Sequence, residues 1–203
     1  MSNSSAQSAA ATAKSKPVID LSGVQMADII LTRNEETQSK AIRIGTCSAY
    51  SHAILVLDKG YCIEAVGKGV QSPLLTDALK KATHGTLMRH KTIDPNYAGW
   101  IVHYARTLGP KPYDMVGAVR SGVASGCDPR IQLTPVGLII SLVDHKIKNG
   151  KQNHDDSFFC SELIVRAFEK AGLPLINGRA HTATPRAIAK SNYLNYIKDV
   201  VKV

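Results

Sequence analysis

The chain has 203 residues, enough for one domain with a hydrophobic core. Its formal net charge of +9 suits an anionic surface such as a cell-wall polymer, a membrane or a nucleic acid, but no RNA- or DNA-binding signature accompanies it. No apolar run reaches the roughly 18–20 residues that a membrane span needs. The four cysteines form no CxxC pair, which argues against a zinc ribbon, and we expect mostly free thiols.

The first residues, 1–16, are rich in Ser, Ala and Thr and contain no apolar core segment. They therefore do not form a secretory signal peptide, and we predict a disordered tail over 1–17 followed by one domain over 18–203. The protein is expected to be made in the cytoplasm and, if it acts in a target periplasm, to be exported by a route without such a signal. Residues 121–153 read as an insertion with one apolar helix, about 135–146.

The remaining segments predict an α+β fold built on an antiparallel sheet. The stretch 18–26 reads as a short helix or turn, and 67–72 as extended or bulged chain. Five further segments are predicted as strands, from β-branched content or position: 28–33, 51–57, 61–66, 86–91 and 193–203. Helices are predicted from apolar spacing and capping residues over 37–44, 73–82, 96–108 and 184–191.

A hairpin is the clearest local signal. Asp58-Lys59-Gly60 is turn chemistry between two strands of alternating side chains. If this turn pairs Leu57 with Tyr61, His52 faces Val66 and lies diagonal to Glu64 on the same face of the sheet, within reach of a hydrogen bond. A register slip of one residue would place the two side chains on opposite faces.

Cys160 is predicted to lie in the first turn of an amphipathic helix. Apolar residues recur after it at helical spacing, the run 155–157 offers capping oxygens before it, and Gly172 ends the helix. Unpaired N–H groups at a helix start favour a thiolate over a thiol, so Cys160 is a candidate nucleophile. The alternative is a plain buried thiol, since free cysteine is among the residues most often found inside proteins.

A thiolate nucleophile needs a base, and the base needs an acceptor that orients it. His52 and Glu64 on one face of the hairpin supply such a pair. Taken singly, His52 could be a satisfied core histidine and Glu64 a carboxylate at the rim, but their joint placement favours catalysis. A metal site from Cys47, His52 and Cys62 matches no standard zinc spacing. We predict neither a metal nor a cofactor.

Several segments in this order resemble the circularly permuted NlpC-type cysteine hydrolases of the YiiX-like group, which are papain-like domains with histidine before cysteine. The segments are 28–32, 51–56, 63–67, 112–114, 159–163 and 184–185.

The resemblance implies an antiparallel sheet or open barrel with the cysteine helix packed on it. It implies Cys160 as nucleophile, His52 as base and Glu64 as the third polar residue. The backbone N–H of Cys160 is expected to bind the oxyanion. Four further residues are expected to shape the substrate cleft: Tyr50, Ser51, Tyr113 and Ser161.

Three functions follow from these observations. The first is a peptidoglycan amidase or endopeptidase, exported as an antibacterial effector by a contact-dependent, type VI-like secretion system and paired with an immunity protein. The second is a lipid hydrolase or acyltransferase that uses the same Cys-His-Glu site, with the apolar stretch 136–143 contacting acyl chains. The third is a non-enzymatic binding module that acts through its basic surface.

Overall fold

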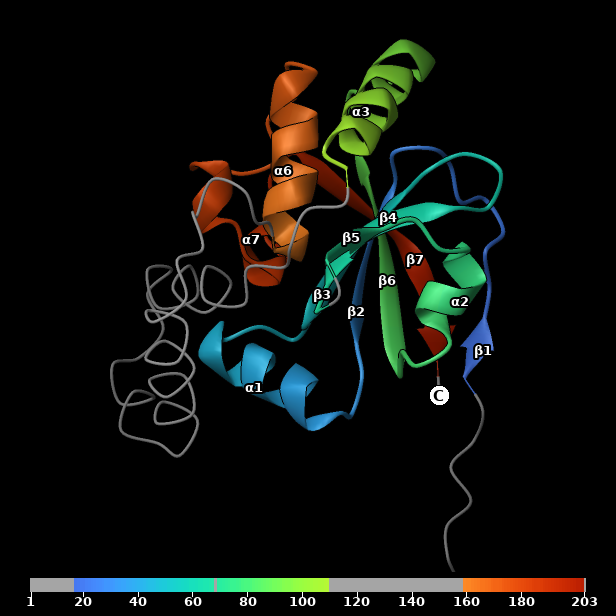
Figure 1. Cartoon of the computed structure of the whole chain (residues 1–203), viewed down its shortest axis with the longest axis vertical. Coiled ribbons are helices and arrows are strands. Elements are labelled where there is room, and N and C mark those ends of the chain that lie inside the picture. Colours follow the sequence, from blue (N-terminus) through green and yellow to red (C-terminus); the bar gives the residue numbers. More distant parts are fainter. Residues whose placement is uncertain (1–16, 68, 110–158, 203) are drawn as a thin grey trace, which may run out of the picture.

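The computed structural model describes residues 17–67, 69–109 and 159–202. In this part of the chain the fold is α+β, with helices packed on a seven-stranded antiparallel sheet whose strand order is β1-β7-β6-β2-β3-β4-β5 (Figure 1). The predicted tail, the predicted insertion over 121–153 and Tyr113 lie outside the described residues. The open barrel and the permuted order of the papain-like fold stay predictions.

The described elements follow the predicted order closely. The strands are β1 Val18–Ile19, β2 Ile29–Arg33, β3 His52–Val56, β4 Cys62–Val66, β5 Gly69–Gln71, β6 His84–His90 and β7 Leu194–Lys202. The helices are α1 Thr37–Gly45, α2 Leu75–Leu79, α3 Pro95–Thr107, α6 Cys160–Lys170 and α7 Pro185–Ala189, with one 3₁₀ turn, η3 Ala180–Thr182.

The first strand departs from the predicted helix or turn over 18–26. Val18 and Ile19 form β1, which pairs with Lys202 and Val201 of β7 at the edge of the sheet. A two-residue strand has too few side chains to show alternation in the sequence, and its partner lies at the far end of the chain. Turns follow it before β2 begins.

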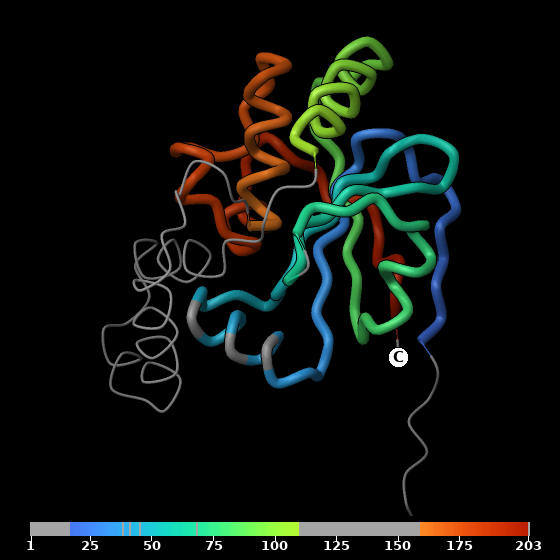
Figure 2. Tube along the Cα trace, viewed as in Figure 1, coloured from blue at the N-terminus to red at the C-terminus, as the bar shows by residue number. Residues whose placement is uncertain are grey.

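Alternating side chains of the sheet point to its two faces and belong to two separate hydrophobic cores. Ile29 and Leu31 of β2 join the core that includes α3 and α6, whereas Ile30 between them joins the core that includes α2. All three side chains are completely buried. The chain trace shows α3 and α6 side by side, although they are far apart in the sequence (Figure 2).

A buried ion pair ties β2 to β6. The guanidinium of Arg89 donates two hydrogen bonds of 2.7 Å to the Asp28 carboxylate, which is 1% exposed. A third guanidinium hydrogen bond reaches the carbonyl of Gly23. The pKa of Arg89 is raised, first by its hydrogen bonds to Asp28 and then by the charge of that carboxylate, with burial acting in the opposite direction. The pair fixes the chain at the entrance to β2.

Candidate active site

The hairpin has the register that its turn predicts. Val56 pairs with Cys62, and the N–H of Leu57 donates to the carbonyl of Tyr61. Continuing this register places His52 diagonal to Glu64. Nε2 of His52 lies 2.7 Å from Oε2 of Glu64, and the Glu64 side chain is only 9% exposed. The structure therefore brings the predicted histidine and carboxylate together, and the Nδ1 edge of the imidazole remains for another partner.

Cys160 occupies a gap between β3 and β4. Ladder pairing of the two strands ends at Leu55 and Ile63. In an antiparallel ladder every second residue donates its N–H to the same partner strand. After Leu57 and Leu55, the next such residue of β3 is Ala53, whose N–H would donate to the carbonyl of Ala65 if the ladder continued. It donates instead to the sulfur of Cys160, which also forms a hydrogen bond with His52. The sulfur thus contacts the edge of β3 where the ladder stops.

The nucleophile helix begins at Cys160 itself. Phe159 is the N-cap residue, in an extended conformation and without a side-chain capping bond. The acidic run over 155–157, predicted to cap the helix, does not hold the N-cap position. Phe159 is buried, and the large apolar ring anchors the helix start in the protein interior. The first N–H groups of α6 point outward along the helix axis beside the sulfur, where they favour negative charge.

The electrostatics of the site favour a thiolate and an imidazolium. Burial raises the pKa of the Cys160 thiol. The charge and hydrogen bond of His52, together with hydrogen bonds from Ala53 and Ser161, lower it by more, so that the net pKa lies below the usual value. Burial lowers the pKa of His52, but the Cys160 thiolate and then Glu64 raise it to about 10. Each charge therefore stabilises the other.

The remaining predicted site residues have different surroundings. Ser51 is buried, and its hydroxyl lies 2.6 Å from that of Ser39 in α1, so it holds α1 against β3. Ser161 is completely buried and its Oγ lies 3.9 Å from the Cys160 sulfur. Tyr50 is half-buried and its hydroxyl contacts Thr86. Tyr113 lies outside the described residues.

The described cysteines differ sharply from one another. Cys47 is disulfide-bonded, whereas Cys62 and Cys160 are free. Burial and then the charge of Glu64 raise the pKa of Cys62 to about 12. Of the two free thiols, Cys160 alone has a lowered pKa.

Two features of the neighbourhood were missed by sequence reasoning. One is the Ala53 N–H, which carries no side-chain signal. The other is a cluster of polar side chains around Thr86, including His84 and Asp199, that long-range pairing of β6 with β7 brings together. The alternation of His84, Thr86 and Met88 along β6 is the one sequence signal that these side chains share a face.

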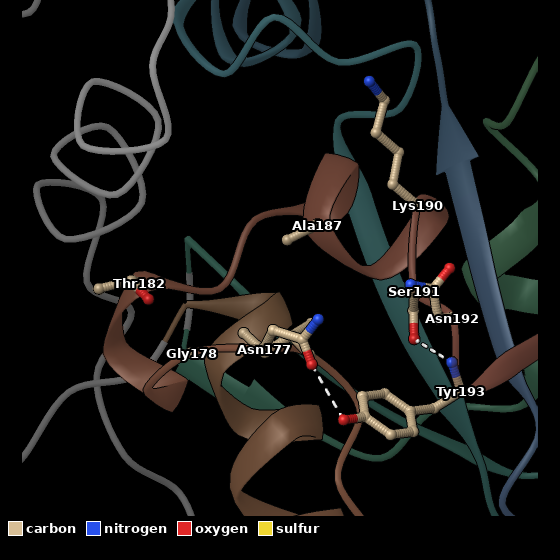
Figure 3. Close-up of a pocket in the computed structure, with 9 residues that line it drawn as sticks. Asn177, Gly178, Thr182, Ala187, Lys190, Ser191, Asn192 and Tyr193 are labelled. Atoms are coloured by element: carbon tan, nitrogen blue, oxygen red, sulfur yellow. Dashed lines mark hydrogen bonds between the residues drawn. The ribbon is translucent and has the colours of Figure 1, made fainter.

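A separate pocket of about 330 Å³ lies among the segment after α6, η3, α7 and the segment before β7 (Figure 3). The hydroxyl of Tyr193 donates a 2.9 Å hydrogen bond to Oδ1 of Asn177 across this pocket. None of Cys160, His52 and Glu64 lines it. The pocket is therefore distinct from the candidate active site.

Two structural findings concern metals and membranes. Within the described ranges, no group of three or more His, Cys, Asp or Glu side chains is arranged to hold a metal ion. Among the helices of the same residues, none is long and apolar enough to cross a membrane.

Comparison with known sequences finds one relevant relative. No protein-family model matches the chain. The chain is 25% identical over 164 residues to the probable lipoprotein peptidase YaeF of Escherichia coli (strain K12), and the alignment covers 78% of this chain and 60% of that protein. The chain thus spans about 60% of the length of this relative.

Comparison with solved structures shows the fold. The chain matches the crystal structure of the metalloprotein yiiX from Escherichia coli O157:H7 with a TM-score of 0.60 and 18% sequence identity, over 85% of this chain and 96% of that one. The described side chains do not fit a metal site of three or more such ligands. The chain has a YiiX-like fold, and both similarities support its resemblance to the YiiX-like, papain-like proteins.

Proposed function

We propose that the chain is a cysteine hydrolase of amide bonds, with Cys160 as nucleophile, His52 as base and acid, and Glu64 as the residue that orients His52. One observation carries this proposal. The sulfur of Cys160 forms a hydrogen bond with His52, whose Nε2 is held 2.7 Å from Glu64. A nucleophile, a base and an orienting acceptor in contact are the parts that covalent catalysis requires. The peptidase name of the relative YaeF supports hydrolysis.

In the acylation step, the Cys160 thiolate attacks the carbonyl carbon of the substrate amide. The carbonyl oxygen becomes an oxyanion, and the backbone N–H of Cys160 at the start of α6 is the proposed donor to it. The His52 imidazolium then gives its proton to the leaving amine as the C–N bond breaks. The products of this step are a thioester on Cys160, a free amine and a neutral imidazole.

In the deacylation step, His52 accepts a proton from water as the water oxygen attacks the thioester. The tetrahedral intermediate collapses with loss of the Cys160 thiolate, which leaves a carboxylic acid product and restores the imidazolium. Glu64 accepts a hydrogen bond from Nε2 of His52 throughout, so it fixes the ring and stabilises its positive charge. No other group needs to change its protonation state.

The proposed substrate is a peptide stem or cross-link of the bacterial cell wall. The net charge of +9 supports binding to an anionic polymer. Export as an effector through a contact-dependent machine, and an immunity protein as partner, stay predictions.

Digestion of purified sacculi tests the substrate. We expect new peptide fragments with the wild type, no fragments with Cys160→Ala, and undiminished digestion with the control Cys62→Ala, which removes the other described free thiol. Activity that survives in Cys160→Ala would show that the nucleophile is wrong. An intact sacculus, combined with thiol-dependent cleavage of an acyl ester, would show that the hydrolase acts on lipids instead.

A further inference from the structure

A second polar cluster lies on the sheet face that α6 covers. It consists of Tyr50, His84, Thr86, Tyr196 and Asp199, and we refer to it as the Asp199 cluster. Thr86 pairs with Leu31, which belongs to the same core as Cys160, and this pairing identifies the face. Neither Cys160 nor His52 is among the hydrogen-bond partners of the cluster.

The hydrogen bonds of the cluster have a fixed direction. The Thr86 hydroxyl donates its single proton to Oδ1 of Asp199 at 3.1 Å. Tyr50, whose hydroxyl lies 2.9 Å from Thr86, must therefore be a donor to it, and so must Nε2 of His84 at 3.1 Å. The Tyr196 hydroxyl also donates to Asp199. Two of these four protons reach the Asp199 carboxylate and the other two reach the Thr86 hydroxyl that donates to it, so the positions left for a ligand are oxygen lone pairs and aromatic faces.

Asp199 differs from most carboxylates in the described part of this basic chain. Asp28 and Asp58 pair with Arg89 and Arg106, and Lys198 pairs with Asp20. In the described part of the chain, no Lys or Arg forms an ion pair with Asp199, and the nearest basic nitrogen is Nε2 of His84 at 3.7 Å. The Asp199 side chain is 25% exposed, so a ligand can reach it.

The cluster lies in line with the candidate active site. Strand pairing joins Ala53, Leu31, Thr86 and Asp199 in one row across β3, β2, β6 and β7. Neighbouring strands are about 4.8 Å apart, so three steps along this row span roughly 14 Å. Cys160 contacts the first residue of the row and Asp199 is the last. Tyr50 precedes His52 by two residues, and its ring must cross β2 to reach Thr86.

We propose that the Asp199 cluster binds a primary ammonium group of the substrate, and this inference rests on the proposed hydrolase function. A protonated amine is a pure donor with positive charge, and it matches a site that offers only acceptors, one carboxylate and the rings of Tyr50 and Tyr196. An extended peptide covers about 14 Å in roughly four residues. The substrate class is therefore a peptide whose free amine, on a diamino acid or at its amino end, lies several residues from the scissile carbonyl.

Binding to Cys160→Ala protein tests the proposal without hydrolysis. The probes are N-acetyl-lysine amide and its uncharged counterpart N-acetyl-norleucine amide, followed by NMR shifts of the rings of Tyr50, His84 and Tyr196. We expect the lysine probe to bind at least tenfold more tightly, and Asp199→Asn to remove that advantage. Glu169→Gln, which deletes an exposed carboxylate near the other end of α6, is the matched control and should retain it.

Two further variants guard against misfolding as an explanation. The Tyr196 residue is 60% exposed, so Tyr196→Ala should fold normally and weaken lysine binding severalfold, whereas Tyr196→Phe should retain most of it through its ring. Equal affinity for the two probes, or full lysine binding in Asp199→Asn, overturns the ammonium site. Because the protein used carries no Cys160 thiol, a failure of the hydrolase function would be seen in the sacculus digestion and not here.

Discussion

The backbone N–H of Ala53 donates a hydrogen bond to the sulfur of Cys160 in the position where a continued ladder would direct it to β4. Through this contact, the backbone of β3 helps to fix the position of the proposed nucleophile. A sulfur that replaces a ladder acceptor is held by the backbone of β3 as well as by its own helix.

Cys160 should be the thiol that reacts selectively at low pH. Iodoacetamide at pH 6 is expected to alkylate Cys160, whose pKa is lowered chiefly by His52 against the effect of burial, and to leave Cys62 unlabelled because burial and Glu64 raise its pKa to about 12. His52→Ala should slow labelling more than tenfold, since the two largest effects that oppose burial, the charge and the hydrogen bond of His52, are then lost. Mass spectrometry of the digested protein measures both sites.

His103→Ala is the control for that experiment, because His103 is an exposed histidine on α3. It should label like the wild type. Equal labelling of Cys160 and Cys62 in the wild type would contradict an activated nucleophile.

Hydrolysis should decline at high pH as His52 loses its proton. The pKa of His52 is raised to about 10, with burial opposing Cys160 and Glu64, so the imidazolium needed to protonate the leaving amine is present below that pH and lost as pH rises through it. Glu64→Gln removes an acceptor and a charge that favour the imidazolium, so the falling limb should move to lower pH and kcat should drop roughly 10²-fold. A pH–rate profile measures both effects. An unchanged limb would show that Glu64 does not act on His52.

Arg89→Met should destabilise the fold by about 3–5 kcal/mol, because it leaves the Asp28 carboxylate buried without its partner. Urea unfolding measures the loss. The double variant Asp28→Leu with Arg89→Met should recover part of the stability, since no unpaired buried charge remains.

Lys80→Met breaks the exposed Lys80–Asp77 pair and serves as the control, with an expected cost of about 0–1 kcal/mol. If Arg89→Met costs no more than Lys80→Met, the buried pair does not fix β2 to β6 as proposed.

Asp94→Ala should lower the free energy of unfolding by about 1 kcal/mol. The Asp94 carboxylate accepts hydrogen bonds from the backbone N–H groups of Asn96 and Tyr97 at the start of α3. Asp94→Asn keeps an acceptor oxygen at the same place and should retain most of the stability. Thermal or urea unfolding followed by circular dichroism distinguishes the two, and equal loss in both variants would point to charge rather than capping.

The sequence contained enough information to predict the hairpin contact, because the turn at 58–60 fixes a local register and with it the relation of His52 to Glu64. The cysteine helix was also predictable, since its apolar spacing is local. Its true N-cap, Phe159, was not, because an apolar N-cap depends on burial against distant residues.

The Asp199 cluster, in contrast, could not be predicted from the sequence. His84 and Asp199 are more than a hundred residues apart in the chain, and two register shifts between β6 and β7 decide which side chains meet. No local pattern reveals such irregular pairing. The strand β1 was missed for a related reason, as its partner is the last strand of the sheet.

Cys62 lies on β4 two residues before Glu64, and the rate at which its thiol is modified measures how often the domain opens. The Cys62 thiol is buried in the core that includes α2, so a reagent in solution modifies it only when β4 leaves the sheet. The modification rate of Cys62 therefore reports the integrity of the whole domain, while that of Cys160 reports the chemistry of one site. A variant that alters the second rate and not the first has lost function with its architecture intact.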